Sequence, residues 1–130
     1  MRWTATEESE QAALVQWARL NRGHIPGVEM LMHVPNGGWR HPTVGARLKA
    51  LGVSAGFPDL ALFCRRGGYC GLAIEMKSPS GNGRVRPEQR AWLVALQQEG
   101  WATMVAITWV EAANSITLYL RGEWKQSEVA

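Results

Sequence analysis

The residues of this sequence best suited to chemistry are two carboxylates and a lysine at the ends of two short apolar segments. Asp59 begins the segment DLALFC, and Glu75 and Lys77 end the segment GLAIEMK. Charged side chains are rarely buried in strands unless they are paired or have a function. Glu75 and Lys77 are two residues apart, so on a strand both side chains point to one face, whereas Ile74 and Met76 point to the other.

A hairpin would bring the two carboxylates together. The turn RRGGY between the segments is short enough for an antiparallel hairpin, which places Asp59 beside Glu75. Two carboxylates about 4–6 Å apart repel each other, and burial raises the cost of ionising both. A divalent cation removes this conflict, and hard oxygen ligands favour Mg²⁺ or Mn²⁺. A lysine beside the metal can orient or deprotonate a water molecule, or stabilise the charge that develops in phosphodiester hydrolysis.

A salt-bridged group at the end of a sheet is the other interpretation of these three residues. On spacing alone the two interpretations are equally good, because D…ExK patterns occur often by chance. Two features of the context favour a site. Gly56, Phe57 and Pro58 rigidify the approach to Asp59, and the two carboxylates lie on opposite arms of one predicted hairpin.

The elements that must position these residues are predicted in the order helix, strand, helix, hairpin, helix, strand, helix. Helices are predicted over 6–23, 41–52, 87–100 and 110–122, and strands over 29–34, 59–64, 71–77 and 101–109. Thr6 is a plausible cap of the first helix, Gly23 ends it, and a polar loop spans 78–86. This order predicts one mixed α/β domain over residues 1–130, with a central sheet flanked by helices.

Composition excludes several classes of protein. The chain has 130 residues, of which 46% are hydrophobic and 19% charged, and this suits one soluble domain. No apolar run approaches the ~20 residues of a membrane span. The N-terminus lacks an apolar signal region, so a cytoplasmic location is expected. Cys64 and Cys70 could face each other across the hairpin, but two cysteines give no disulfide framework and no zinc spacing. The net charge of +3 permits an anionic partner without identifying one.

The motif GFPDL followed by IEMK resembles the signature of the PD-(D/E)xK nucleases. More narrowly, the chain resembles the VRR-NUC domain, the virus-type replication-repair nuclease, in its stand-alone viral or bacterial form. The resemblance covers most of the chain: EESEQAALVQWA, HVPNGG with RHPTVGARLKALGV, GFPDL, IEMKSPSGNGRVRPEQRAWLVALQQEG and the strand after it. It implies a restriction-endonuclease-like core, a role in DNA repair, and hydrolysis of DNA with Mg²⁺ or Mn²⁺.

The resemblance also implies the roles of single residues. In such nucleases Asp59 and Glu75 bind the metal, helped by the backbone carbonyl of Met76, and Lys77 is catalytic. Gln89, in the segment PEQRAWL, matches a residue that the family places near the site. Taken alone, Gln89 lies at the edge of the buried helix face, where a glutamine is usually a boundary residue.

A glutamate of the first helix faces the metal through water in this family. By its distance to the following QAALV, Glu7 fits this role best, and Glu10, three residues on, stays an alternative. Alone, a glutamate in the first turn is usually a partner of the helix dipole. His33 in MHVPN is more often a hydrogen-bonded core histidine than a ligand.

Basic residues are grouped after the PNGG turn, at the hairpin tip and after the predicted active-site strand. Solvated surface is the ordinary explanation for any one of them. Arg84 and Arg86, however, follow Lys77 in a glycine-rich loop, where a phosphate backbone must pass to reach a metal. Phosphate contacts give affinity without reading sequence, and no base-reading module is evident, so selectivity for DNA shape is expected. The predicted DNA contacts are Arg40, Arg47, Lys49, Arg84, Arg86 and Arg90.

The sequence therefore predicts a metal-dependent DNA endonuclease. The stand-alone relatives resemble Holliday junction resolvases, and two symmetric cuts call for two active sites, so a homodimer is expected. The seven tryptophans and the other apolar residues could cover its interface. The alternatives are a nuclease acting on flaps, nicks or duplex ends, a nucleic-acid-binding module without activity, and a structural protein with a fortuitous salt bridge.

Overall fold

Four short strands form one mixed sheet in the order β1-β2-β3-β4. This computed structural model describes residues 6–35, 42–79 and 84–127. The strand β2 is antiparallel to both β1 and β3, and β4 is parallel to β3. A parallel neighbour requires a crossover, and the helix α3 provides it between β3 and β4. The strands are β1 (Leu31–His33), β2 (Leu60–Leu62), β3 (Leu72–Met76) and β4 (Ala102–Ala106).

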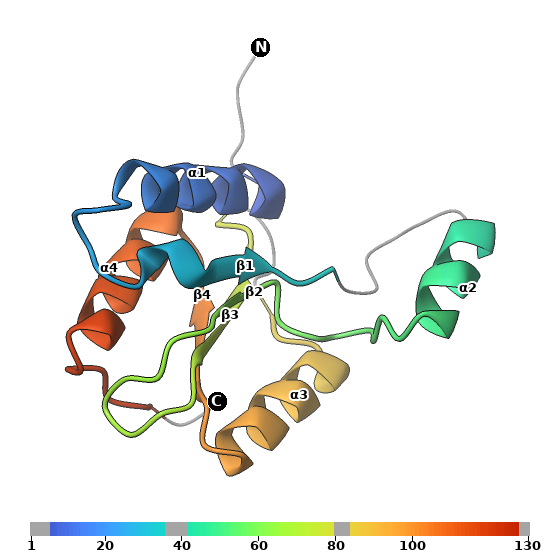
Figure 1. The fold of residues 1–130 in the computed structure, drawn as a ribbon. Helices are drawn as coiled ribbons and strands as arrows, with labels where there is room; N and C mark the ends of the chain where they lie inside the picture. The colour runs from blue at the N-terminus through green and yellow to red at the C-terminus, as the bar shows by residue number, and fades with distance from the viewer. Residues whose placement is uncertain (1–5, 36–41, 80–83, 128–130) are drawn as a thin grey trace.

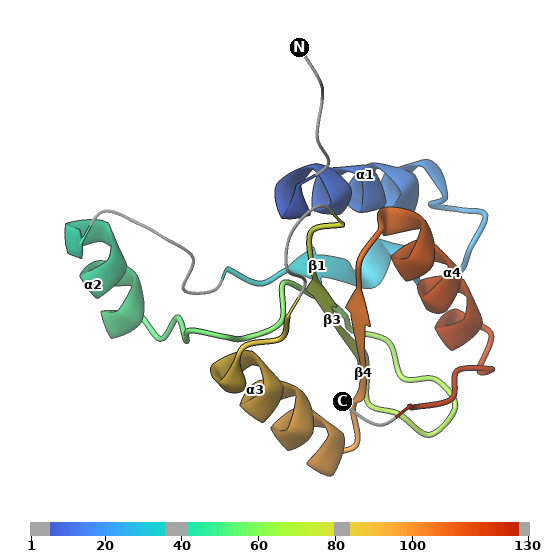
Figure 2. The same cartoon turned by 180° about the vertical axis from the view of Figure 1, so that it is seen from behind.

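Helices cover both faces of this sheet. Figures 1 and 2 show α1 and α4 together on one side, α3 on the other side, and α2 standing away from the body of the molecule. The helices are α1 (Glu7–Leu20), α2 (Pro42–Ala50), α3 (Pro87–Gln98) and α4 (Trp109–Leu120), and a 3-10 helix η1 spans Val28–Met30. None of the described helices combines the length and the hydropathy needed to span a bilayer.

The two faces of the sheet differ in chemistry. On the side of α1 and α4, β3 contributes Leu72, Ile74 and Met76 to a hydrophobic core that also contains Leu14 and Ile116. This alternation along β3 follows from the period of two of a strand. The large apolar side chains therefore hold α1 and α4 to the sheet and leave the alternate residues of β3 to the opposite face.

Small and polar residues line the face toward α3. Ala61 and Ala73 are buried there beside Thr103, whose hydroxyl accepts a hydrogen bond of 2.6 Å from Gln97 Nε2 of α3. Short side chains let the helix approach the sheet closely. The polar residues of β3 are consequently enclosed between the sheet and α3.

The predicted order of elements and the mixed α/β fold are confirmed, and the hairpin of β2 and β3 is antiparallel as expected. The predicted strand over 29–34 is shorter in the structure. Gly27 adopts a left-handed conformation with φ 97°, and its N–H donates to Glu29 Oε2, which begins the 3-10 helix η1 in place of the strand's first residues. The first helix ends at Leu20 rather than near Gly23, because the side chain of Asn21 caps the Trp17 carbonyl.

Candidate active site

Strand β3 places Glu75 and Lys77 on the face of the sheet toward α3. Glu75 is 2% exposed and Lys77 is 5% exposed. Lys77 lies just beyond the strand, but its N–H still donates to the Ala106 carbonyl of β4 at 2.8 Å. The parallel ladder therefore extends far enough to give Lys77 the same orientation as Glu75. Their charged atoms, Lys77 Nζ and Glu75 Oε1, lie 3.5 Å apart.

Gln89, in the first turn of α3, joins these two charged side chains. Its Oε1 accepts a hydrogen bond of 2.7 Å from Lys77 Nζ and another of 2.8 Å from the backbone N–H of Arg86. Its Nε2 donates to Glu75 Oε1 at 2.8 Å. An amide is the side chain that can accept from an ammonium group and donate to a carboxylate at once. Gln89 is 5% exposed and is therefore part of the buried network rather than a boundary residue.

Asp59 precedes β2 and reaches the same end of the sheet. The pairing of Leu60 with Ile74 puts Asp59 opposite Glu75 when the register is extended by one residue, and opposed side chains share a face. Asp59 Oδ2 accepts a hydrogen bond of 2.7 Å from the Met76 N–H. The carboxylate is thus fixed to the backbone between Glu75 and Lys77.

The approach to Asp59 is set by Gly56. Gly56 has φ 84°, in the left-handed region that favours glycine. A Cβ atom at this position would lie 2.8 Å from the backbone carbonyl carbon of Glu88 in α3. The segment from Gly56 to Asp59 therefore packs directly against the start of the helix that carries Gln89.

The electrostatics of this group raise the pKa of Glu75 from its ordinary value of 4.5 to about 8. Burial is the main cause, and the negative charges of Asp59 and Glu7 act in the same direction. The ammonium of Lys77 lowers the pKa, by its charge and by a hydrogen bond, but does not offset the burial. Without a further cation, Glu75 therefore holds its proton at neutral pH.

A cation would fit beside Glu75. Among the described residues no group of three or more His, Cys, Asp and Glu side chains is placed to hold a metal ion. A hard cation that keeps several waters needs only one or two carboxylates, which Asp59 and Glu75 can supply. Glu75 Oε2 is buried and has no hydrogen-bond partner in the described part of the chain. Such an unpartnered carboxylate oxygen is costly unless it is protonated or binds a cation.

The first helix begins close to this group. Glu7 lies near enough for its charge to raise the pKa of Glu75. Glu7 is exposed, which suits a contact through water.

His33 is attached to the same site, which sequence reasoning did not anticipate. Its Nδ1 lies 2.8 Å from the Asp59 carbonyl oxygen and 3.0 Å from Gln11 Nε2. The Asp59 carbonyl only accepts and the Gln11 amide nitrogen only donates, so the tautomer of His33 selects which of the two contacts is a hydrogen bond. His33 is hydrogen-bonded, as expected, but it is exposed and does not belong to the core. The pairing of β1 with β2, which places His33 opposite Leu60, is the signal that could have identified this contact.

The predicted DNA-binding residues are divided between two places. Arg84, Arg86 and Arg90 are exposed around the start of α3, beside the buried network. Arg86 also forms an ion pair of 3.6 Å with Glu88. Arg47 and Lys49 are exposed on α2, away from the body of the molecule (Figure 1). Arg40 lies outside the described residues.

The cysteines and tryptophans take no part in this group. Cys64 Sγ donates to the Gly27 carbonyl and Cys70 Sγ to the Glu99 carbonyl, so the two thiols do not face each other across the hairpin. Both cysteines are free. The five tryptophans within the described ranges are half-buried and pack against the core or other aromatic rings: Trp17, Trp92, Trp101, Trp109 and Trp124.

A mixed sheet flanked by helices, with two carboxylates and a lysine at one end of two neighbouring strands, is the arrangement of the PD-(D/E)xK nucleases. The family model of the VRR-NUC domain matches residues 2–107, and the chain belongs to this family. A solved structure described as a VRR_NUC domain protein is similar over 92% of both chains, with 29% identity and a TM-score of 0.75. No curated protein matches the chain.

Family membership makes the chain a nuclease of the PD-(D/E)xK type, for which DNA is the implied substrate. Nucleases of this family generally use divalent metal ions. The resemblance and the fold class predicted from the sequence are confirmed. The helix α4 follows the matched residues, and its Ile116 and Tyr119 complete the hydrophobic core.

Proposed function

We propose that this protein is a metal-dependent DNA endonuclease whose active site consists of Asp59, Glu75, Lys77 and Gln89. The observation that carries the proposal is the buried network in which Gln89 holds Lys77 and Glu75 within hydrogen-bonding distance while Asp59 is fixed to the Met76 N–H. A salt bridge that served stability alone would need neither a second carboxylate nor a carboxylate oxygen without a partner.

Asp59 and Glu75 would hold the metal ion together with the Met76 carbonyl, and Glu7 would contact it through water. When bound, Mg²⁺ or Mn²⁺ supplies a Lewis acid that polarises the scissile phosphate and lowers the pKa of the attacking water. Lys77 provides a fixed positive charge for orienting that water or for the charge of the transition state. Gln89 keeps the ammonium of Lys77 in place at 2.7 Å, so little reorganisation is needed during the reaction.

Arg84, Arg86 and Arg90 would bind the phosphate backbone beside this site, and Arg40, Arg47 and Lys49 would bind it further away. Contacts of this kind do not read sequence. They support selectivity for DNA structure, with branched DNA such as a four-way junction as the preferred substrate. The chain would act as a single nuclease domain over residues 1–130, in the cytoplasm of a bacterial or virus-infected cell.

A homodimer would provide the two cuts that a four-way junction requires. The helix α2 supports this part of the proposal, because none of its residues is buried and it stands apart in Figure 2. Val44 is 49% exposed and Leu51 is 74% exposed, at the spacing of one helix face. Beside Leu51 lies a groove of about 340 Å³ that Val34, Phe57 and Trp92 also line. A second copy could cover this apolar surface, with an interface of at least about 1,000 Å².

Cleavage of labelled four-way junctions, flaps, nicked duplex, linear duplex and single strands tests the proposal, with Mg²⁺, Mn²⁺ or EDTA. Asp59→Asn, Glu75→Gln and Lys77→Met should each abolish cutting while binding to DNA in EDTA is retained. Lys125→Met is a matched control, because Lys125 is exposed and far along the chain from the site. Full activity of Glu75→Gln, or undiminished cutting in EDTA, would reject the mechanism.

Sedimentation at micromolar concentration tests the dimer. A dimer that cuts junctions in preference to linear duplex of the same sequence is the expected result. A monomer that cuts both substrates equally would reduce the proposal to a general metal-dependent nuclease. It would also favour flaps, nicks or duplex ends as the substrate.

A further inference from the structure

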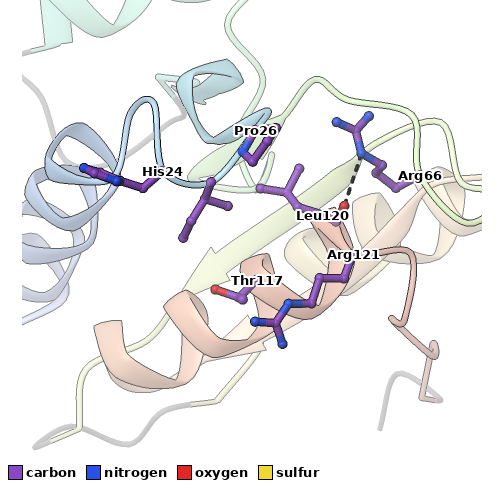
Figure 3. A pocket seen from close by; sticks show the side chains of 7 residues that line it. His24, Pro26, Arg66, Thr117, Leu120 and Arg121 are labelled. Carbon is purple, nitrogen blue, oxygen red and sulfur yellow. Dashed lines mark hydrogen bonds between the residues drawn. The ribbon is translucent and has the colours of Figure 1, made fainter.

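A pocket of about 400 Å³ lies at the end of the sheet opposite to the active site. Figure 3 shows it between the loop after α1, the hairpin that leads into β3, and the last turn of α4. Arg66 precedes β3, whereas Glu75 is near the end of that strand, and the five residues of β3 span roughly 16 Å. The pocket is therefore separate from the network of Glu75, Lys77 and Gln89.

The floor of this pocket is apolar and its rim is basic. Ile25, Pro26 and Leu120 provide the apolar surface. Arg66 and Arg121 flank Leu120, and His24 lies on the opposite side (Figure 3). None of the described residues that line the pocket is a carboxylate. A cavity of this size, with an apolar lining and a few convergent polar groups, is typical of a binding site.

The two arginines carry their positive charge without a carboxylate in direct contact in the described part of the chain. Arg66 donates from Nε to the Leu120 carbonyl at 3.3 Å and from Nη1 to the Arg65 carbonyl at 2.8 Å. These bonds hold the guanidinium of Arg66 at the rim, and the first satisfies the last carbonyl of α4, but neither involves an anion. Among the described residues neither Arg66 nor Arg121 forms an ion pair. The rim is thus a positive surface around an apolar hollow, with Arg66 held in place by backbone carbonyls.

The lining favours a peptide over a nucleic acid. A base of a single strand binds best by stacking on the ring of Phe, Tyr or Trp, and none of these is among the described residues that line the pocket. The backbone of a duplex is convex and presents no apolar group that could reach a floor of Ile25, Pro26 and Leu120. An aliphatic side chain between carboxylates meets both requirements, because it fills the hollow and pairs with the rim.

We propose that this pocket binds an acidic peptide segment of a partner protein. One apolar side chain of the segment enters between Ile25, Pro26 and Leu120, and flanking carboxylates pair with Arg66 and Arg121. Bidentate pairing of guanidinium with carboxylate gives the complex its specificity for acidic residues. The proposal does not depend on the nuclease activity, because it uses no residue of the active site.

Fluorescence anisotropy with a short labelled peptide of aspartates and glutamates around one leucine tests this proposal. Arg121→Glu should weaken binding by about tenfold or more, because it replaces an attraction by a repulsion. Replacing the leucine of the peptide by alanine should weaken binding by a similar factor, since the apolar floor loses its occupant. Arg19→Glu is the matched control, because Arg19 is exposed and does not line the pocket, and it should leave binding nearly unchanged.

Thermal unfolding establishes that each variant is folded. Thr117→Phe is a second variant, which places a ring in the pocket without changing the charge, and it should also abolish binding. Equal weakening by Arg121→Glu and Arg19→Glu would overturn the proposal, because it would reduce the effect to net charge. Peptide binding that does not depend on the leucine would also overturn the proposal. So would tight binding of a labelled single-stranded oligonucleotide, if Thr117→Phe abolished that binding while the peptide failed to bind.

Discussion

Replacing Glu75 by glutamine should stabilise the metal-free protein, and the gain should increase with pH. Burial, followed by the charge of Asp59, raises the pKa of Glu75 from 4.5 to about 8, although Lys77 lowers it. The folded protein therefore keeps this proton to a higher pH than the unfolded chain does. The stabilisation that this proton contributes is fully present below pH 4.5 and is lost as the pH rises through about 8. Glutamine has the shape of the protonated side chain but no proton to lose.

The size of the effect follows from the pKa values. A rise from 4.5 to about 8 corresponds to about 5 kcal/mol of unfolding free energy above pH 8. The loss is about 1 kcal/mol at pH 5 and about 3 kcal/mol at pH 7, because it accumulates between the two pKa values. For a domain of this size, 1 kcal/mol changes the Tm by roughly 3–5 °C. The Tm of Glu75→Gln should therefore exceed that of the natural protein by about 10 °C at pH 7.

Thermal unfolding in EDTA at pH 5, 7 and 9 measures this difference. Glu99→Gln is the control, because Glu99 is exposed and should show no such trend. A Tm difference that is constant or shrinks with pH would show that Glu75 is ionised in the folded protein and would refute the reasoning. Mn²⁺ added at pH 7 should reverse the order of stability, because only the natural protein can exchange its proton for the cation.

Three further predictions concern the surroundings of the site. His33→Asn should retain most of the cleavage rate, because the Asn amide can replace the Nδ1 contact with the Asp59 carbonyl, whereas His33→Phe should lower kcat with little change in KM. Gly56→Ala should cost about 2 kcal/mol or more of stability, measured by chemical denaturation, because it combines a positive φ with a contact of 2.8 Å to the backbone of α3. Arg84→Gln together with Arg86→Gln should weaken DNA binding in EDTA and reduce the slope of log K against log salt by about 2; an unchanged slope would remove these residues from the interface.

Local sequence patterns predicted most of the fold because each element carries its own signals. Thr6 and Pro87 mark helix starts, and the alternation in LAIEM separates core residues from site residues. Glu75 and Lys77 point to the same face of the sheet because the hydrogen bonds between β3 and β4 continue through Lys77. Where a prediction was wrong, a side chain competed with the pattern. Glu29 accepts the Gly27 N–H, and η1 replaces the first residues of the predicted strand.

The contacts between elements could not be predicted in the same way. The role of Gln89 as the link between Lys77 and Glu75 depends on how α3 crosses the sheet, and no local pattern determines that crossing. The contact from His33 to the Asp59 carbonyl depends on the register of β1 against β2. Arg66 and Arg121 lie more than fifty positions apart in the sequence, so no local pattern indicated that they line one pocket.

The site residues share a physical property that explains why they can act together. The backbone around Asp59 is fixed by the Val34 N–H, which donates to its carbonyl at 2.9 Å, and its side chain is fixed by the Met76 N–H. Gln89 is fixed by the Arg86 N–H before it contacts any charged group. Backbone N–H groups therefore orient Asp59 and Gln89, and the side chain of Gln89 in turn orients Lys77 and Glu75. Such orientation before substrate binding lets charge that develops in a transition state be stabilised without rearrangement. The arginines around the start of α3 are exposed, which suits contacts to a phosphate backbone whose path differs between DNA structures.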